Sequence, residues 1–430
     1  MDVLPSNIIL DIFSRVPAKC LARSRCVSKG WCKYINDRYL VIIHDQRVKE
    51  EPIPILYHFH CFSYYSVHSL CYHVVKSKRN ATRRYNKKAR VGTKQTGTAG
   101  HTYMSELKED SFLEFLRKKP LSESSDVKIE VLGSCNGLMC LSQYEEYAPT
   151  MLNPFYPEDY APTPLVVVHP LRKECYELPP LPMRFDKFTR GSCGLGFDSS
   201  TNTLKMVFVL HKHSAPACAL VHVFGTNSWR EIPKVPSYPI RGKAIFVNGC
   251  LHWLVSDLDF KAEHGGRNYV TWFDVEKEEF GLIESPKRMC DVWRNYSCDF
   301  DHLVDLNGEV GFVCASTMDV WVLKQKEWIP HYRFEKKRVP NGDIEVLGCW
   351  NKDGDILIRN TGRRKYEFFV YNLKSGVRHK TNIVVPFNGC QPNIFMHPNK
   401  LISTHGIGTN SFPVKKADFK RSCQHSLSCY

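Results

Sequence analysis

Large apolar residues are crowded into the first turns of the chain. Ile8, Ile9, Leu10, Ile12 and Phe13 all fall within six residues. The flanking prolines predict a helix here, because Pro5 suits a first helical turn and Pro17 ends a helix about one residue earlier. At 100° per residue these side chains cover roughly half of the circumference, which exceeds the ~100° stripe of an ordinary surface helix.

The pattern predicts two further short helices, from Ala18 to Cys26 and from Ser28 to Asp37, with Ser28 suited to cap the second. They add the apolar residues Leu21, Val27, Trp31 and Ile35. Three short helices in about 40 residues cannot bury this much apolar surface by themselves. The surplus therefore packs either on the rest of the chain or on another protein.

From about Val127 the pattern changes to short apolar runs separated by turn residues. The turns lie at Asn136-Gly137, Asp198 to Asn202, Asn248-Gly249, Asn307-Gly308 and Asp353-Gly354, about 45 to 60 residues apart. Asn-Gly and Asp-Gly between apolar runs are strong hairpin signals. A second strand pair, often with an aromatic residue, follows each turn. The chain therefore repeats a unit of four strands.

Four strands at this period are typical of the blades of a β-propeller. Five units are clear, and the stretches before Val127 and after Thr381 supply a sixth or more, with the ring closed by strands from both ends. We expect about six or seven blades. A pair of β-sandwiches is the structural alternative, but five repeats of one pattern favour the ring.

The residues of the N-terminal segment also stand in a recognisable order. Leu4-Pro5, Ile8-Ile9, Ile12-Phe13, Val16-Pro17, Leu21 and Val27-Ser28-Lys29-Gly30-Trp31 closely resemble the F-box motif over about 40 residues. In that family a three-helix domain binds the Skp-type adaptor of a cullin-based ubiquitin ligase. The resemblance implies that the surplus apolar face is an adaptor-binding surface, and that cullin is reached through the adaptor.

The resemblance implies twelve candidate adaptor-binding residues. They are Leu4, Pro5, Ile8, Ile9, Ile12, Phe13, Val16, Pro17, Leu21, Val27, Lys29 and Trp31. The apolar members either bury in the adaptor or hold the three helices together, and the sequence does not separate these two roles.

A second resemblance covers much of the remaining chain. The phrases GFDSSTNTLKMVFV, HVFGTNSWREIP, FVNGCLHWLV, LVDLNGEVGFVC, DVWVLKQKEW and YEFFVYNLKSG are similar to the plant F-box-associated domain, which is kelch-like. We expect a mixed fold, in which a small all-α three-helix F-box is followed by an all-β kelch-like β-propeller. The expected boundaries are 1–45 for the F-box, 46–126 for a junction with first strands, 127–415 for the propeller and 416–430 for a tail.

The two resemblances imply a substrate-recognition adaptor of an SCF-type (Skp–cullin–F-box) ubiquitin ligase. In this interpretation the F-box binds the Skp adaptor, the propeller binds a target protein, and the chain itself is not an enzyme. The sequence identifies neither the target nor the residues that bind it. Two alternatives stay open, a propeller scaffold outside any ligase and a basic nuclear protein associated with nucleic acid.

The net charge of +15 has a local source. Residues 76–94 contain nine Lys or Arg and no acidic residue. Such a run is typical of a solvated loop, and a nuclear-localisation signal or a patch for an anionic partner is the alternative. No nucleic-acid-binding motif frames these charges, which argues against nucleic acid as the main partner. No apolar run is long enough for a membrane helix, no secretory signal is present, and we expect the protein in the nucleus and cytoplasm.

The chemistry-bearing residues do not form a known catalytic or metal motif. The 18 cysteines contain no CxxC pair and are scattered, which favours small buried thiols. The stretch from His58 to His73 has four His and two Cys, but its spacing fits no usual zinc pattern, and an aromatic-rich strand pair is favoured. His252 is interpreted as a packed strand residue rather than a base. We expect no metal, no cofactor and no catalytic residue.

Four segments between the expected strands carry residue types that are common in protein interfaces. They are residues 144–162, 211–218, 256–268 and 285–299. Loops at one end of a rigid ring are suited to bind a partner. The sequence does not indicate which of them face it.

Overall fold

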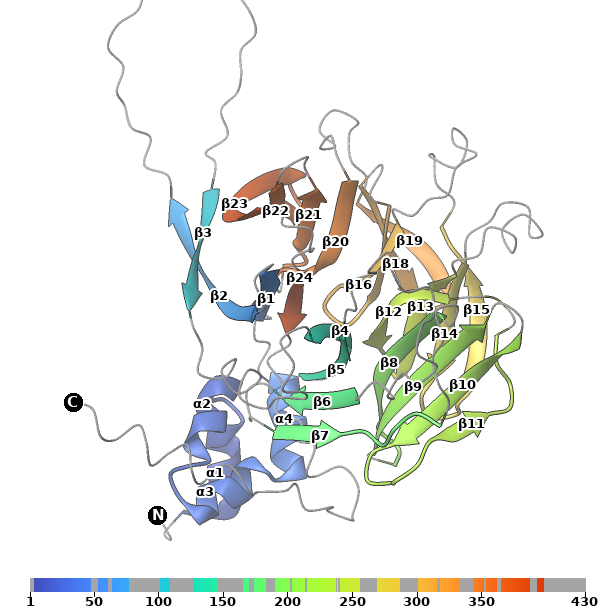
Figure 1. Cartoon of the computed structure of the whole chain (residues 1–430). Coiled ribbons are helices and arrows are strands. Elements are labelled where there is room, and N and C mark those ends of the chain that lie inside the picture. Colours follow the sequence, from blue (N-terminus) through green and yellow to red (C-terminus); the bar gives the residue numbers. More distant parts are fainter. Residues whose placement is uncertain are drawn as a thin grey trace, which may run out of the picture.

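The computed structural model describes residues 4–47, 53–60, 64–76, 101–108, 127–135, 137–145, 165–169, 174–182, 190–201, 203–212, 215–236, 238, 240–255, 269–286, 301–314, 318–332, 343–351, 353–361, 365–386 and 393–397. A group of helices at the start of the chain is followed by a ring of β-sheets (Figure 1). The expected mixed fold, all-α and then all-β, is confirmed.

The described part of the N-terminal segment forms four helices. They are α1 (Ser6–Phe13), α2 (Ala18–Ser24), α3 (Lys29–Ile35) and α4 (Arg38–Arg47). The first three match the predicted helices, and Ser28 caps α3 by accepting a hydrogen bond from the Trp31 backbone N–H at 3.1 Å. Helix α4 was not predicted, because five apolar residues in a row from Tyr39 to Ile43 show no helical period.

The helices share a small core of their own. Its buried members are Phe13, Ala18, Leu21, Ile35 and Leu40. The Phe13 ring meets the edge of Trp31 at 5.0 Å between centroids, an arrangement that aromatic pairs favour. Helix α4 closes this core, and its buried His44 ring lies 2.8 Å, through Nε2, from the Val16 carbonyl oxygen.

The described residues that follow form 24 strands. They are β1 (Ile53–His60), β2 (Tyr64–Lys76), β3 (His101–Lys108), β4 (Val127–Cys135), β5 (Leu138–Glu145), β6 (Leu165–His169), β7 (Glu174–Glu177), β8 (Arg190–Asp198), β9 (Thr203–Lys212), β10 (Ala215–Val223), β11 (Arg230–Ile232), β12 (Ile240–Val247), β13 (Cys250–Val255), β14 (Tyr269–Asp274), β15 (Glu279–Glu284), β16 (Asp301–Asp305), β17 (Val310–Cys314), β18 (Asp319–Lys324), β19 (Glu327–Tyr332), β20 (Asp343–Cys349), β21 (Ile356–Thr361), β22 (Lys365–Asn372), β23 (Val377–Pro386) and β24 (Asn393–His397).

These strands form five sheets, so the expectation of about six or seven separate blades was slightly too high. Four sheets have four strands each, in the orders β4-β5-β6-β7, β11-β10-β9-β8, β12-β13-β14-β15 and β16-β17-β18-β19. The fifth has eight strands in the order β20-β21-β22-β23-β3-β2-β1-β24. Its two four-stranded halves meet at one parallel pair, Thr381 with Tyr103, which joins two blade-sized units into one sheet.

The second of these halves combines strands from both ends of the chain. Strand β24 pairs with β1 from Ile53↔His397 to Tyr57↔Asn393, and β1 continues through β2 to β3. The ring is therefore completed by strands from before Val127 and after Thr381, as the sequence predicted. The stretch from His58 to His73 lies in the antiparallel pair β1 and β2, as expected for a strand pair.

The five predicted turns each join the first two strands of a blade. The turns connect β4 to β5, β8 to β9, β12 to β13, β16 to β17 and β20 to β21. Asn248 and Gly249 have φ values of 52° and 78°, the left-handed conformation that a two-residue hairpin of this type requires. Asn307 and Gly308 repeat it, with φ values of 57° and 92°.

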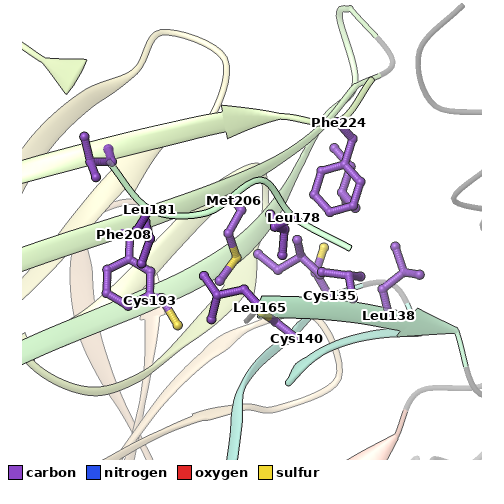
Figure 2. Packing of buried hydrophobic residues seen from close by; sticks show 14 of the residues in the cluster. Cys135, Leu138, Cys140, Leu165, Leu178, Leu181, Cys193, Met206, Phe208 and Phe224 are labelled. Atoms are coloured by element: carbon purple, nitrogen blue, oxygen red, sulfur yellow. The ribbon is translucent and has the colours of Figure 1, made fainter. Parts of the chain in front are cut away.

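Apolar clusters between neighbouring sheets hold the ring together. In one of them, Cys135, Leu138 and Leu165 of the β4–β7 sheet pack with Met206 and Phe208 of the β8–β11 sheet (Figure 2). A four-stranded sheet buries both of its faces only when it has a neighbour on each side. Side chains of this size supply that packing.

Tryptophan side chains add hydrogen bonds between successive sheets. The Trp229 indole N–H donates to the Pro179 carbonyl oxygen at 2.8 Å, and the Trp328 indole N–H donates to the Glu284 carbonyl oxygen at 2.8 Å. Both tryptophans lie in or next to the last strand of their own sheet and reach the end of the last strand of the preceding one. The sequence indicated that such aromatics pack between blades, and the structure shows which backbone atoms they bond.

Candidate functional site: an exposed apolar face on the helices

Three apolar side chains on and just before α1 are exposed. Leu4, Ile8 and Ile12 are 50%, 42% and 48% exposed. Ile8 and Ile12 are one helical turn apart and share one face of α1, and Leu4 lies two residues before the helix begins. The start of the chain thus presents three large aliphatic groups to solvent. Such a group of side chains is a candidate binding surface for another apolar surface.

A second exposed segment joins α2 to α3. Residues 26–30 are all exposed, and Val27 at 64% is the most exposed of the large apolar side chains in the described part of the chain. Lys29 lies in the same segment, while Pro5 and Pro17 are exposed at the N-terminal ends of α1 and α2. Seven of the twelve predicted site residues are therefore on the surface.

The other five predicted site residues face inward. Phe13 and Leu21 are buried in the helical core, and Ile9, Val16 and Trp31 are half-buried against it. These side chains hold the helices in place rather than offering surface to a partner. The structure thus separates the two roles that the sequence left combined.

Two exposed apolar residues were missed by the sequence analysis. Tyr39 and Ile42 of α4 are 60% and 45% exposed and lie one helical turn apart. Asp37 offers a helix-start signal before them, because its carboxylate accepts a hydrogen bond from the Tyr39 backbone N–H at 2.8 Å. Reading Asp37 as a cap would have predicted α4, and with it an outward position for both residues.

The charge on the helices is mostly positive, since residues 4–47 contain eight Lys or Arg and three Asp. Asp11 bonds to Arg15 and Arg47, and the hydrogen bonds from these two guanidinium groups, Arg47 first, hold the pKa of the Asp11 carboxyl below its usual value. From Ile12 to Asn36 the sequence contains no Asp or Glu and has six Lys or Arg. An apolar face within basic surroundings favours a partner with an apolar surface and few cations nearby.

The ring offers no comparable chemical site among its described residues. No group of three or more His, Cys, Asp or Glu side chains that is suited to hold a metal ion occurs in the described part of the chain. No described helix is long and apolar enough to cross a membrane. Burial lowers the pKa of His252 to about 4, against a smaller raising effect of the backbone groups of Ile245 and Cys250. This is a packed strand residue, as its place in the sequence predicted.

Three of the four candidate interface segments, 144–162, 256–268 and 285–299, fall almost entirely outside the described residues. The fourth, 211–218, lies mostly in strands rather than in a loop, because β9 extends to Lys212 and β10 begins at Ala215. The strand ends that flank them are described, and all lie at one end of the ring, opposite the five short turns, because successive strands of each sheet are antiparallel. Strand β3 runs parallel to β23, and β2 and β1 follow it antiparallel, so β1 begins at the end of its sheet where the β20–β21 turn lies. Strand β24 ends there too, at Ile53↔His397. The helices therefore join the ring at the end opposite these segments.

Comparison with known proteins finds one family for the N-terminal helices and another for most of the ring. Residues 1–41 match a family described as "F-box-like", and residues 95–398 match the "F-box associated beta propeller domain". F-box protein CPR1 of Arabidopsis thaliana is 26% identical over 353 residues, covering 76% of this chain and 70% of that protein. F-box protein At1g47340 of Arabidopsis thaliana is 23% identical over 396 residues, covering 88% and 75%.

Among solved structures, a mutant of AofleA from Arthrobotrys oligospora is similar with a TM-score of 0.36 and 11% identity, over 69% of this chain and 80% of that chain. A likeness of this size carries no functional meaning.

Proposed function

This chain belongs to the plant F-box proteins with a C-terminal F-box-associated β-propeller domain, and on that premise we propose that it is the substrate-recognition subunit of an SCF-type ubiquitin ligase. Its helices bind a Skp-type adaptor, and its ring binds a target protein. The chain contributes no catalytic group of its own. The nuclear and cytoplasmic localisation expected from the sequence stays a prediction.

The exposure of the apolar side chains on and just before α1 is the observation that supports this proposal most directly. Water-exposed aliphatic side chains gain roughly 1.5–3 kcal/mol each when they are fully buried. Leu4, Ile8 and Ile12 are about half-exposed in the free chain, and burial against an adaptor would recover part of that free energy from each. Five other motif residues already pack in the helical core. The fold of the helices therefore does not explain why Leu4, Ile8 and Ile12 are apolar.

The ring completes the proposed role as a rigid holder of the target. Bringing the target close to the ubiquitin-carrying subunits raises its effective concentration there without new chemistry. The strand ends that flank the four candidate interface segments lie opposite the end at which the helices join, which leaves that end of the ring open to a target while an adaptor occupies the helices.

Adaptor binding by a surface variant tests the proposal. The full chain and a Leu4→Ala, Ile8→Ala, Ile12→Ala variant are titrated with a purified plant Skp-type adaptor in a calorimeter. We expect binding by the wild type and a loss of about 100-fold or more in the variant, because three aliphatic contacts are truncated. Binding should depend weakly on salt, since the surface is apolar.

A matched control comes from the ring. Leu282→Ala and Ile329→Ala truncate aliphatic side chains that are 38% and 47% exposed on β15 and β19. This double variant should bind the adaptor as the wild type does. The proposal is wrong if the wild type does not bind, or if a folded α1 variant binds equally well.

A further inference from the structure

Ser28 stands at the centre of the exposed segment of residues 26–30. Its backbone is extended, with φ −158° and ψ 162°, and its hydroxyl accepts the Trp31 N–H at 3.1 Å. Val27 beside it is 64% exposed. A group that is attached to Ser28 therefore changes the surface next to one of the candidate adaptor contacts.

The residues around Ser28 are basic. Arg23 and Arg25 stand five and three residues before it, and Lys29 follows it. Serine kinases select substrates by charge pattern, and a kinase with an acidic substrate groove favours arginines at these upstream positions. Arg23 is exposed and lies in the last turn of α2, a position where helices fray.

Two neighbouring serines lack this accessibility. Ser14 is fully buried, and its hydroxyl donates to the Asp11 carbonyl oxygen at 2.7 Å. The Ser24 hydroxyl donates to the Cys20 carbonyl oxygen at 2.9 Å within α2. Ser28 is thus the serine of this region that combines exposure with an extended backbone and two upstream arginines.

We propose that Ser28 is a phosphorylation site for a serine kinase that selects basic substrates, and that its phosphate switches off adaptor binding. In the reaction the Ser28 Oγ attacks the γ-phosphorus of ATP and forms a new O–P bond. The bond from that phosphorus to the oxygen bridging the β- and γ-phosphates breaks, ADP leaves, and the hydroxyl proton passes to the kinase's base. The second half of the proposal rests on the proposed function.

The phosphate acts on binding through its charge. It adds about −1.5 to −2 charges at pH 7 directly beside Val27. Burying that charge against an apolar adaptor surface costs much more than burying the serine hydroxyl. Arg23 and Lys29 offer cations to the free phosphorylated chain, which stabilises the unbound form further. A bound adaptor that covers Val27 should also protect the neighbouring Ser28 from the kinase.

The phosphorylation half is tested on the full chain with a kinase of this selectivity and Mg-ATP. Mass spectrometry of the digested product should place one phosphate on Ser28. Ser28→Ala should remove that phosphopeptide, and Arg23→Gln should slow its formation. A kinase that modifies other serines of the folded chain and leaves Ser28 unmodified overturns the proposal.

The binding half is tested with two variants that differ only in charge. Ser28→Asp and Ser28→Asn both keep a side chain that caps α3, so both should fold alike by circular dichroism. Titration with the purified plant Skp-type adaptor should show Asn within about twofold of the wild type and Asp weaker by about tenfold or more.

Equal binding by the Asp and Asn variants overturns the switch while leaving the proposed function intact. Absence of binding by the wild type overturns the proposed function and the switch together. The mass-spectrometric result decides the modification independently of either.

Discussion

Ile12 and Phe13 are neighbours in the chain and have opposite surroundings. Ile12 is 48% exposed, whereas Phe13 is 6% exposed and in contact with Trp31. Successive residues point 100° apart on a helix, so adjacent apolar residues of one motif can serve a partner and the core respectively. A substitution at Ile12 should therefore reduce binding with little loss of stability, and one at Phe13 should unfold the helices.

His252 makes the stability of the ring depend on pH. Its pKa falls from 6.5 to about 4 because burial disfavours the charged ring. The unfolded chain therefore takes up a proton that the folded chain rejects, and stability decreases as the pH falls from about 6.5 towards 4. Between pH 7.5 and pH 5 we expect this residue to cost about 2 kcal/mol in the free energy of unfolding.

Urea unfolding at the two pH values measures this effect. Other groups also titrate in this range, among them the buried His222, whose pKa is lowered by burial as well. The comparison is therefore with His252→Gln, which keeps a polar side chain but does not titrate. The variant should lose less stability on acidification than the wild type. Parallel losses in both proteins would contradict the assignment.

At the scale of elements, a buried ionic cluster joins two sheets. The Lys205 ammonium on β9 lies 3.0 Å from Asp198 Oδ2 and 3.0 Å from Glu278 Oε1, and it donates to the Val275 carbonyl oxygen at 2.8 Å. Burial alone would raise the pKa of Asp198 and Glu278. Hydrogen bonds from their partners, Lys205 among them, instead hold both pKa values below the ordinary range.

Removing the shared cation should weaken this junction strongly. Lys205→Met leaves the Asp198 carboxylate buried without its counter-ion, and we expect a loss of about 3–5 kcal/mol in the free energy of unfolding. The matched control is Lys277→Met. That side chain is 69% exposed and 4.0 Å from Asp274, so its loss should cost at most about 0.5 kcal/mol. Similar small losses in both variants, measured in urea, would show that the cluster does not hold the sheets together.

The sequence predicted well those elements whose conformation is set by residues next to one another in the chain. Asn248-Gly249 and Asn307-Gly308 specify their hairpins because few other residues tolerate two successive positive φ values. The bonds from Trp229 to Pro179 and from Lys205 to Glu278 span 50 and 73 positions. A local residue pattern does not identify a partner that lies so far away in the sequence. The sequence therefore predicted that the blades pack on one another, but not which residues form the contacts.

The same distinction applies to the candidate site. The motif placed all twelve residues in the F-box, but exposure depends on how α4 closes the core, and α4 was not predicted. Without that packing, the sequence does not show that Ile8 is exposed and Ile9 is half-buried. Tyr39 and Ile42 were missed for the same reason, because their outward position is a property of the helix they lie on.

At the scale of the whole molecule, the ring depends on a strand that lies far from its partner in sequence. The sequence predicted closure from both ends but left the number of blades open. The reason is physical, since the closing half-sheet takes β1, β2 and β3 from residues 53–108 and β24 from residues 393–397. No repeat of turns marks such a discontinuous unit, and its joining to β23 through Thr381 and Tyr103 gives five sheets rather than six.

Truncation tests how much the ring relies on this closure. A chain that ends at Pro386 lacks β24 and so loses the five residue pairs from Ile53↔His397 to Tyr57↔Asn393. With about 0.5–1.5 kcal/mol for each hydrogen bond, the loss is on the order of 5 kcal/mol. Strand β1 then has an unpaired edge, which also favours aggregation. We expect a lower urea midpoint and early proteolysis within β1 to β3.

A chain that ends at His397 keeps β24 and is the matched control. Equal midpoints for the two truncated chains would mean that the ring is stable while open, and that the ends meet without holding it together.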